Sequence, residues 1–433
     1  MKKKLFSIIA FSALLSFGAN AQTYSLQQCI DIALENNRQV KQQSLAKQER
    51  DIAYRQARQN LLPSLNAGVS QEFSFGRAKD ENDVYQSINS ASTAFGISSN
   101  LTLFDGLKMK YNIDARRAEM YASEANLEKV KADIVMTVST AYLQVLMNKE
   151  LLQTSENQLF LTKELMKQRQ KLIETGKLAE GEIFELQAQE AKEELNRVRA
   201  ENTLKLSLLD LAQIMEISPL NPPQGDFDVL PASPLVGDLG GLEDIYESAL
   251  KNRPEMKSAN YKLQSSEKNV SIARADYFPT LSFRASANTE YYNKKDLSFD
   301  KQLFSEYPRA GIGFSLNIPI FNRFETKNRV ETAKLSVENS KLEIETTKKE
   351  LFKNIQQAHQ NALAAKERWQ AADKSAKAMQ EAYRYAEQKY NNGRATQYEV
   401  FQAKNNLASV LSEQTQAKFE YAFRVRILEL MRE

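Results

Sequence analysis

The chain has 433 residues and a formal net charge of +3, which becomes zero without the three lysines of its first 21 residues (55 basic against 55 acidic residues). A balanced charge argues against a nucleic-acid-binding protein, which usually carries a basic surplus. With one histidine and one cysteine, the chain has few side chains suited to acid–base, nucleophilic or metal chemistry. A single cysteine also excludes an intrachain disulfide. We therefore expect no enzyme activity, no cofactor and no nucleic-acid partner.

A targeting segment is predicted at residues 1–21. Lys2–Lys4 form a basic start, Leu5–Phe17 form an apolar run, and Ala19-Asn20-Ala21 is a small-residue cleavage site. Cleavage after Ala21 would leave Gln22 as the mature N-terminus. The apolar run is too short to cross a bilayer as a helix, so a permanent N-terminal anchor is the weaker alternative.

Cys29 lies eight residues beyond the predicted cut, where it is badly placed for lipidation at a new N-terminus. Cysteine without a disulfide partner behaves as a small hydrophobic residue. We predict that Cys29 is a buried core residue of the first helix.

Two strands are predicted after Pro63, which ends the first helix, at residues 64–75 and 93–104. Apolar residues alternate there with small or polar ones, and they are Leu65, Ala67, Val69, Phe73, Phe75, Phe95, Ile97, Leu101 and Leu103. Segments of about ten residues that are apolar on one face are typical of a transmembrane β-barrel. A soluble sandwich shows the same alternation, so the pattern alone leaves both open.

A very long helix is predicted for residues 107–174, because they contain neither glycine nor proline and their apolar residues recur every three or four positions. At 1.5 Å per residue this helix would be about 100 Å long. A break at residues 174–178 contains Gly176, which suits the end of a helix. A returning helix from Glu182 to Ile217 would complete a hairpin.

The second part of the chain repeats the first. Tyr277–Leu281 matches Leu61–Leu65 at an offset of 216 residues, and Gly393 matches Gly176 at 217. We therefore divide the mature chain into a first repeat (22–217), a Pro/Gly-rich connection (218–241) and a second repeat (242–433), neither repeat being an independent domain.

The second repeat predicts the same elements in the same order. They are strands at 280–291 and 310–320, a long helix at 324–391, a break around Gly393, and a returning helix from Thr396 to Met431. The long helix carries heptad-like apolar residues typical of coiled-coil contact, namely Ile344, Leu351, Ile355, Ala358, Ala362, Ala365 and Trp369. His359 lies among polar residues of this helix, and we expect it to be a solvated surface residue rather than an acid, base or ligand.

Four strands per chain cannot close a membrane barrel, whose known minimum is about eight strands. Open strand edges are not tolerated in lipid. If the strands lie in a membrane, several copies of the chain must therefore share one barrel.

The order and spacing of these features resemble TolC-type outer-membrane channels over residues 24–431. The resemblance rests on Pro63-Ser64-Leu65 and Pro279-Thr280-Leu281 before the strand pairs, on the strand ends Leu101–Gly106 and Ile318–Asn322, and on the glycine-containing hairpin ends. It implies an α+β membrane protein that forms a homotrimer. Its 12-stranded transmembrane β-barrel, with four strands per chain, would continue into a long α-helical coiled-coil periplasmic barrel.

In function, the resemblance implies a passive exit duct in the Gram-negative outer membrane that extends into the periplasm. Its partners would be outer-membrane lipid, a periplasmic adaptor (membrane fusion) protein and an inner-membrane pump of the RND or ABC type. Drug or small-molecule efflux is favoured, and type I secretion of proteins or peptides is the alternative. A periplasmic coiled-coil adaptor or scaffold is an alternative of a different class, but such proteins typically have one hairpin.

The resemblance also implies roles for residues at the two hairpin ends. Those expected to contact the adaptor are Thr175, Gly176, Lys177, Leu178, Asn392, Gly393, Arg394 and Ala395. Those expected at the pore entrance are Glu182, Glu399, Tyr390 and Arg394. The family usually has aspartate at the two acidic positions and arginine at position 395, so a transferred gating salt bridge is less well supported. Acidic residues in the first turns of a helix also stabilise the helix dipole, which is the alternative role of both glutamates.

Overall fold

The computed structural model describes residues 22–79, 83–87, 89–176, 179–217, 227–229, 239–293 and 297–432. The chain forms two compact units. A helical unit comprises Met1–Lys41, Val130–Ala249 and Phe352–Glu433, and a sheet unit comprises Gln42–Lys129 and Leu250–Leu351.

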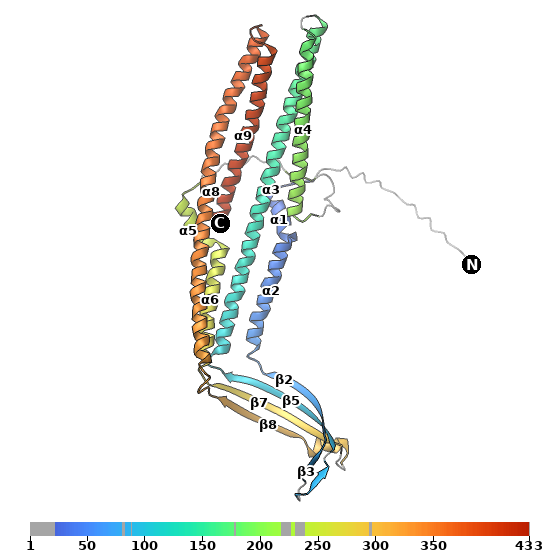
Figure 1. Cartoon of the computed structure of the whole chain (residues 1–433), viewed down its shortest axis with the longest axis vertical. Helices are drawn as coiled ribbons and strands as arrows, with labels where there is room; N and C mark the ends of the chain where they lie inside the picture. Colours follow the sequence, from blue (N-terminus) through green and yellow to red (C-terminus); the bar gives the residue numbers. More distant parts are fainter. Residues whose placement is uncertain are drawn as a thin grey trace, which may run out of the picture. The chain divides into compact units, whose positions relative to one another are not determined.

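The sheet unit contains a four-stranded antiparallel sheet with the order β2-β5-β7-β8 (Figure 1). The strands are β2 (Ser64–Ser74), β5 (Ser90–Phe104), β7 (Thr280–Tyr292) and β8 (Arg309–Asn317). The two sequence repeats each supply one hairpin, and the β5–β7 pairing joins the hairpins. A shorter hairpin, β3 (Arg77–Lys79) with β4 (Tyr85–Ser87), follows β2.

The register places the apolar residues of all four strands on one face. Val69 pairs with Phe95, Ile97 with Ala287, and Phe283 with Phe314. Because paired residues project to the same side of a sheet, the alternation of the separate strands adds up to one continuous apolar face. The opposite face carries small and polar residues.

The strand boundaries differ from the prediction by more than one residue at two places. β5 begins at Ser90 rather than at residue 93, and β8 ends at Asn317 rather than at residue 320. Pro319 has no N–H for the ladder, which fits an early end of this strand. After β7 come two helical segments that the sequence analysis did not predict, α7 (Phe299–Lys301) and the π-helical turn η1 (Gln302–Glu306).

Sharp turns connect strands to long helices in both repeats. Gly106 and Leu107 have φ of 68°, and the equivalent Arg323 and Phe324 have φ of 55° and 63°. A Cβ on Gly106 would lie 2.7 Å from the Cβ of Phe278, so only glycine fits there. Two successive left-handed residues thus form the turn between strand and helix in each repeat.

The sheet unit also contains α2 (Arg38–Gln59, from residue 42), α6 (Pro254–Ala275) and the first parts of α3 (Lys108–Glu174) and α8 (Glu325–Asn391). Asp276, just after α6, accepts hydrogen bonds from Lys108 at 2.6 Å and from Arg329. One carboxylate therefore connects the starts of both long helices.

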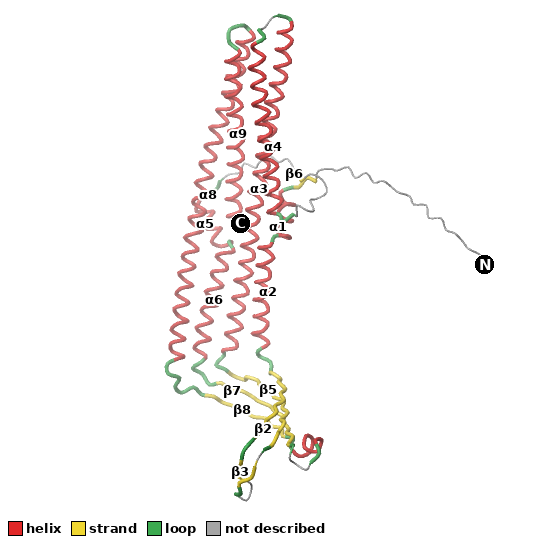
Figure 2. The backbone as a smooth tube through the Cα atoms, turned by 45° about the vertical axis from the view of Figure 1, so that its right-hand side comes forward, coloured by secondary structure: helices red, strands yellow, loops and turns green. Residues whose placement is uncertain are grey.

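In the helical unit, the rest of α3 lies beside α4 (Gly181–Ile214), and the rest of α8 lies beside α9 (Gln397–Arg432) (Figure 2). The predicted long helices 107–174 and 324–391 are confirmed within one residue at their starts, and both end where predicted. The returning helices are likewise present. The unit also contains α1 (Leu26–Asn36), most of α5 (Leu242–Asn252), and a parallel pair of short strands, β1 (Gln22–Tyr24) and β6 (Phe227–Val229).

The core of the helical unit follows the predicted helical spacing. Val138, Val145, Ile355 and Ala362 are fully buried, and Trp369 stacks on Tyr421 at 5.7 Å between ring centres. Cys29 is completely buried, as predicted, and burial raises the pKa of its thiol to about 12. This thiol is a packing group, since its reactive thiolate form is strongly disfavoured.

Candidate functional site

The first hairpin end is closed by a glycine in the left-handed conformation. Gly176 has φ of 68°, and its N–H donates to the carbonyl of Ile173 at 2.9 Å. The Thr175 hydroxyl donates to the carbonyl of Lys171 at 3.1 Å. Lys177 and Leu178 lie outside the described residues.

The second hairpin end has the same backbone geometry. Gly393 also has φ of 68° and donates to the carbonyl of Tyr390 at 2.9 Å, while the N–H of Arg394 donates to Lys389 at 2.8 Å. This is the Schellman pattern, in which glycine lets the last carbonyls of a helix find partners. Asn392 caps the same turn through its side chain, which donates to Gln388 at 2.8 Å, and Ala395 is half-buried.

The two predicted entrance glutamates lie in the first turns of the returning helices. Glu399 is exposed, and its N–H donates to the Thr396 hydroxyl at 3.3 Å, so Thr396 caps α9. The same hydroxyl lies 3.3 Å from the Glu399 carboxylate. The side chain of Glu182 is outside what the structure describes. Within the described residues no ion pair joins Arg394 to Glu399.

Tyr390 contacts a residue that the sequence analysis missed. The guanidinium of Arg169, on α3, lies 4.3 Å from the centre of the Tyr390 ring, on α8. This cation–π contact joins the two hairpins within two helical turns of their ends. No local sequence signal could identify Arg169, because its partner lies 221 positions away in the other repeat.

A buried charged cluster forms a second connection between the hairpins. The Lys404 ammonium (α9) lies 3.5 Å from the Glu193 carboxylate (α4), and the side chains are only 5% and 9% exposed. Fully buried Thr162 (α3) donates to Glu193 and accepts from Lys404. Burial lowers the pKa of Lys404, although Glu193 opposes that shift. The desolvation cost of a buried charge pair offsets much of its attraction, so the pair by itself is weak evidence of added stability.

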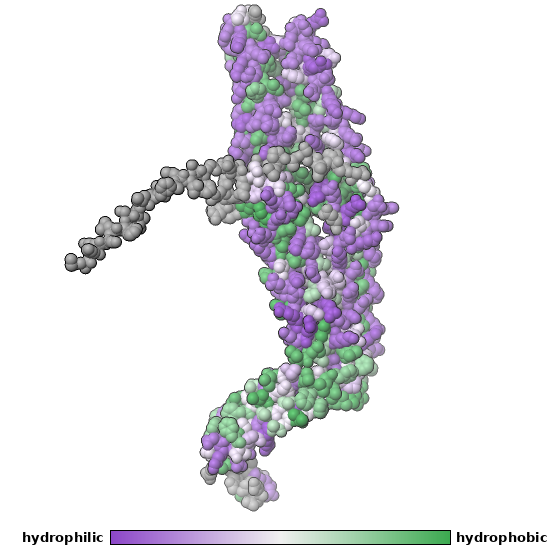
Figure 3. Space-filling view, turned by 180° about the vertical axis from the view of Figure 1, so that it is seen from behind, coloured by the Kyte–Doolittle hydropathy of each residue, from purple (hydrophilic) through white to green (hydrophobic). Residues whose placement is uncertain are grey.

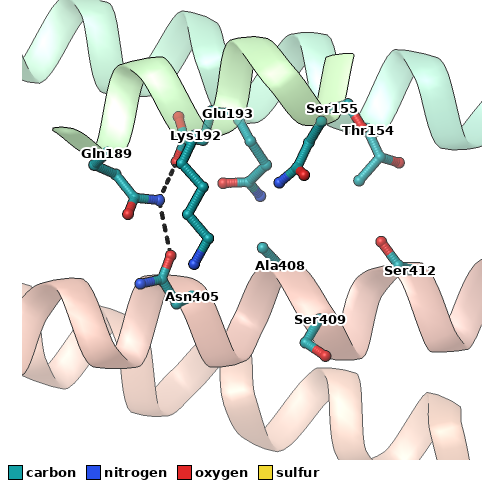
Figure 4. Close-up of a pocket in the computed structure, with 11 residues that line it drawn as sticks. Thr154, Ser155, Gln189, Lys192, Glu193, Asn405, Ala408, Ser409 and Ser412 are labelled. Carbon is teal, nitrogen blue, oxygen red and sulfur yellow. Dashed lines mark hydrogen bonds between the residues drawn. The ribbon is translucent and has the colours of Figure 1, made fainter. Parts of the chain in front are cut away.

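A polar cavity of about 260 Å³ adjoins this cluster (Figure 4). Gln189 lies at its edge and donates to Glu193 at 2.8 Å and to Asn405 at 2.9 Å. Lys192, Ser155 and Ser412 also line it, so α3, α4 and α9 meet here through polar side chains.

The apolar face of the four-stranded sheet is the other unusual surface. Figure 3 shows hydrophobic residues gathered over the strands, whereas hydrophilic residues dominate over the helices. Ile312 is 78% exposed, and Leu65, Val69 and Phe314 are similarly open. A contiguous exposed apolar surface marks an interaction with lipid or with another protein. The outer strands β2 and β8 each have a free edge in the described part of the chain.

The other residues singled out in the sequence lie away from the hairpin ends. Gln22 begins β1, and Ala21 lies outside the described residues. His359 was expected to be solvated, but its Nε2 is 3.3 Å from the Gly240 carbonyl and its side chain is half-exposed. Among the described residues no group of three His, Cys, Asp or Glu side chains could hold a metal ion.

Comparisons with known sequences agree with these features. The family model "Outer membrane efflux protein" matches residues 29–215 and 245–430. The cation efflux system protein CusC of Escherichia coli O157:H7 is 24% identical over 315 residues, which cover 71% of this chain and 63% of CusC. The match thus spans less than two thirds of that relative. The probable efflux pump outer membrane protein TtgC of Pseudomonas putida is 25% identical over 408 residues, 89% of this chain and 78% of TtgC.

Solved structures share the fold. A crystal structure of CusC superimposes with a TM-score of 0.75 at 18% identity, covering 96% of this chain and 95% of that one. The outer membrane protein VceC from Vibrio cholerae gives a TM-score of 0.74 at 16% identity, covering 94% of each chain. Because the family model covers most of both repeats, this chain belongs to the outer membrane efflux protein family.

Proposed function

We propose that this protein is the outer-membrane duct of an export system, a passive channel rather than an enzyme. The observation that carries the proposal is the sheet, which has one continuous apolar face, one polar face and two free outer edges. Such a sheet suits a barrel wall between lipid and water. The duct lies in the Gram-negative outer membrane, and its helices extend into the periplasm.

The duct is a homotrimer. Three sheets of four strands give a barrel of 12 strands, in which β2 of one copy pairs with β8 of the next, so that no edge stays open in lipid. Large apolar side chains exposed on the helices of a single chain support the same assembly, because neighbouring copies would cover them. Examples are Phe160, Phe184, Leu335 and Leu342.

The two faces of β2 provide a matched test. Val69 and Ser70 are adjacent, both exposed, and project to opposite sides of the sheet. In a Cys29→Ser background, a charged thiol reagent should reduce the planar-bilayer conductance of Ser70→Cys and leave that of Val69→Cys unchanged. Equal modification of both, or no channel activity in the unmodified protein, would contradict the proposal.

The hairpin ends form the periplasmic entrance and contact the adaptor. In this proposal Glu182 and Glu399 ring the opening, Tyr390 and Arg394 narrow it, and the turns around Gly176 and Gly393 meet the adaptor. Rings of carboxylates favour cations in channels. The Glu182→Ala, Glu399→Ala double variant should therefore lose cation preference in planar bilayers, and an unchanged preference would argue against this role.

The favoured cargo is a small molecule driven by an inner-membrane pump. The support is that TtgC is described as a probable efflux pump protein and that CusC belongs to a cation efflux system. Type I secretion of proteins or peptides remains the second cargo class. The family assignment favours a duct over a periplasmic adaptor, and extraction distinguishes the two. A duct needs detergent for release, whereas an adaptor without an anchor leaves the membrane in a high-salt, alkaline wash.

A further inference from the structure

One cation on the polar face of the sheet has no carboxylate near it. Arg284 of β7 is exposed, and the register places it between Asn100 of β5 and Gly313 of β8. Its other neighbours on this face, along its own strand and diagonally across the adjacent strands, are all uncharged. They are Ser282, Ser286, Ser98, Thr102, Gly311 and Ser315. Within the described part of the sheet, Arg284 is therefore a cation without a charged partner.

The second arginine of this face has carboxylates close by. Arg309 pairs with Asn288, so Glu290 is its diagonal neighbour on β7, about 7–8 Å away and within reach of a long side chain. In the proposed barrel, β2 of the next copy runs antiparallel to β8. Its Glu72 is the ninth of 11 residues, so it would lie near the Arg309 end of β8. The charge of Arg309 is thus compensated, whereas that of Arg284 is not.

The wall beside Arg284 is open. An added Cβ on Gly311 or Gly313 would meet no atom within 4 Å, and neither glycine has a left-handed φ. The space next to the guanidinium is therefore free within the chain, and amide and hydroxyl groups of the neighbouring residues surround it. Arginine binds carboxylate, sulfonate and phosphate groups through two parallel hydrogen bonds. The surroundings of Arg284 complement such an oxyanion.

The turn that follows β7 is held on the other side of the sheet. The hydroxyl of Thr289, on the apolar face, donates to the carbonyl of Leu303 at 2.8 Å. Gln302 is fully buried, and its side chain accepts from the N–H of Tyr292 and donates to the carbonyl of Leu297, both at 2.8 Å. These bonds hold η1 against the apolar face, so this turn leaves the polar face around Arg284 accessible.

In the proposed trimer, three copies of Arg284 would face one lumen. Strands about 4.8 Å apart and tilted by about 40° give a 12-stranded barrel roughly 24 Å across between backbones. Because the arginine side chains project inward from this wall, a solute on the axis passes within about one Debye length of a guanidinium at 0.1 M salt, about 10 Å. Each solute that leaves through the lumen therefore meets the field of these arginines.

We propose that the three Arg284 side chains form an anion-binding ring in the lumen of the barrel. The carboxylate, sulfonate or phosphate group of an exported small molecule binds there in transit. The proposal rests on the proposed duct function and adds a charge class of cargo to it. Arg309 has no part in this ring, because its charge is compensated.

Block of the planar-bilayer conductance by inorganic tripolyphosphate tests the ring. The protein would carry Glu182→Ala and Glu399→Ala, so that the proposed entrance carboxylates do not repel the anion, and tripolyphosphate would be added to both chambers. In 0.1 M KCl we expect the concentration for half-block to rise about ten-fold or more in Arg284→Gln, since a hydrogen bond to a charged group is lost. Arg309→Gln is the matched control on the same face, with an expected change of about two-fold or less.

The dependence on side-chain shape and on salt follows from the same contact. Arg284→Lys keeps the charge but loses the two parallel donors, so its half-block concentration should lie between those of the parent and Arg284→Gln. In 1 M KCl the Debye length falls to about 3 Å, and the difference between the parent and Arg284→Gln should become small. A difference that is independent of salt would contradict an electrostatic site.

Hexaamminecobalt(III), a trivalent cation, separates the effect of charge from a general change of the barrel. Its block should be unchanged or stronger in Arg284→Gln. Weaker block by both ions in this variant, or equal tripolyphosphate block in the variant and the parent, would overturn the ring and leave the duct intact. A parent protein that forms no conducting channel would overturn the proposed function itself.

The reactivity of a thiol beside Arg284 provides a readout that needs no conductance. Gly313→Cys, in the Cys29→Ser background, places this thiol in the open space of the wall. Two methanethiosulfonate reagents, one bearing a sulfonate and one a trimethylammonium group, attack the same thiolate. The ratio of their rates in detergent at low salt therefore reports the local charge rather than the pKa of the thiol.

The expected change in this ratio follows from Coulomb's law. A guanidinium about 6 Å away in water changes the local concentration of a unit charge about three-fold, in opposite directions for the two reagents. Arg284→Gln should therefore lower the sulfonate-to-ammonium ratio at position 313 about ten-fold, and Arg309→Gln should change it much less. An unchanged ratio in Arg284→Gln would overturn the anion site.

Discussion

Removing the buried ammonium of Lys404 should loosen the junction between the two hairpins. Lys404→Met keeps the length of the side chain and leaves the Glu193 carboxylate buried without its cation. Breaking a buried ion pair by removing one partner costs about 3–5 kcal/mol. Glu193 keeps hydrogen bonds from Thr162 and Gln189, so we expect the lower value, about 3 kcal/mol.

Hydrogen–deuterium exchange in peptides that cover residues 186–200 and 398–410 measures this change. A loss of about 3 kcal/mol in local opening free energy corresponds to a roughly hundred-fold faster exchange. Lys377→Met is the matched control, because Lys377 makes an i,i+4 pair with Asp373 and its side chain is 75% exposed. Such a pair contributes at most about 0.5 kcal/mol, so exchange around it should change about two-fold or less.

A double variant separates the orphaned charge from lost packing. Lys404→Met with Glu193→Leu removes both charges, and replacing a buried pair by apolar residues is often neutral or stabilising. Exchange should therefore return toward that of the parent protein. If Lys404→Met alone exchanges as slowly as the parent, or the double variant as fast as the single one, the reasoning about the buried pair is refuted.

The same lysine gives a pH dependence of known sign. Its folded-state pKa is lowered from the ordinary 10.5, chiefly by burial. At a pH between the folded-state pKa and the unfolded-state pKa, the unfolded chain holds a proton on Lys404 that the folded chain has released. Folding stability therefore rises with pH in that window, and it falls as the pH drops toward the folded-state pKa. We expect the melting temperature of the parent, measured relative to Lys404→Met, to increase as the pH approaches 10.5. A constant or decreasing difference would contradict this sign.

Three further changes test the hairpin ends and the core. Gly393→Ala should lower the free energy of unfolding by about 1 kcal/mol and speed hydrogen–deuterium exchange in the last turn of α8, because alanine disfavours a φ of 68°. Gly181 has no left-handed φ, so Gly181→Ala should have neither effect. Arg169→Ala should lower the free energy of unfolding by about 0.5–2 kcal/mol. If the cation–π contact couples the two residues, Tyr390→Ala should lower it by less in the Arg169→Ala background than in the parent protein. Cys29 should resist maleimide at pH 8 in the folded protein and react in urea, because its pKa is about 12; labelling of the folded chain would contradict its burial.

Local patterns in the sequence were sufficient to predict most of the secondary structure. Long stretches without glycine or proline predicted α3 and α8, and period-two alternation predicted the four strands of the sheet. The glycines at 176 and 393 predicted the hairpin ends. These features depend on backbone sterics and on which face of an element is apolar, so a window of a few residues contains the information. The end of β8 was placed too late because alternation continues past Asn317, where Pro319 interrupts the ladder.

The sequence by itself determined the elements, their order and the duplication, whereas the tertiary structure decided which elements meet. The pairing of β5 with β7 assembles four amphipathic strands into one apolar face. The contacts of Tyr390 with Arg169 and of Lys404 with Glu193 join residues more than 200 positions apart, and Gln302 orders a loop that had no helical signal. Such partners depend on how each helix is rotated and how each strand is registered, and these quantities are set by packing across the whole unit rather than by local spacing.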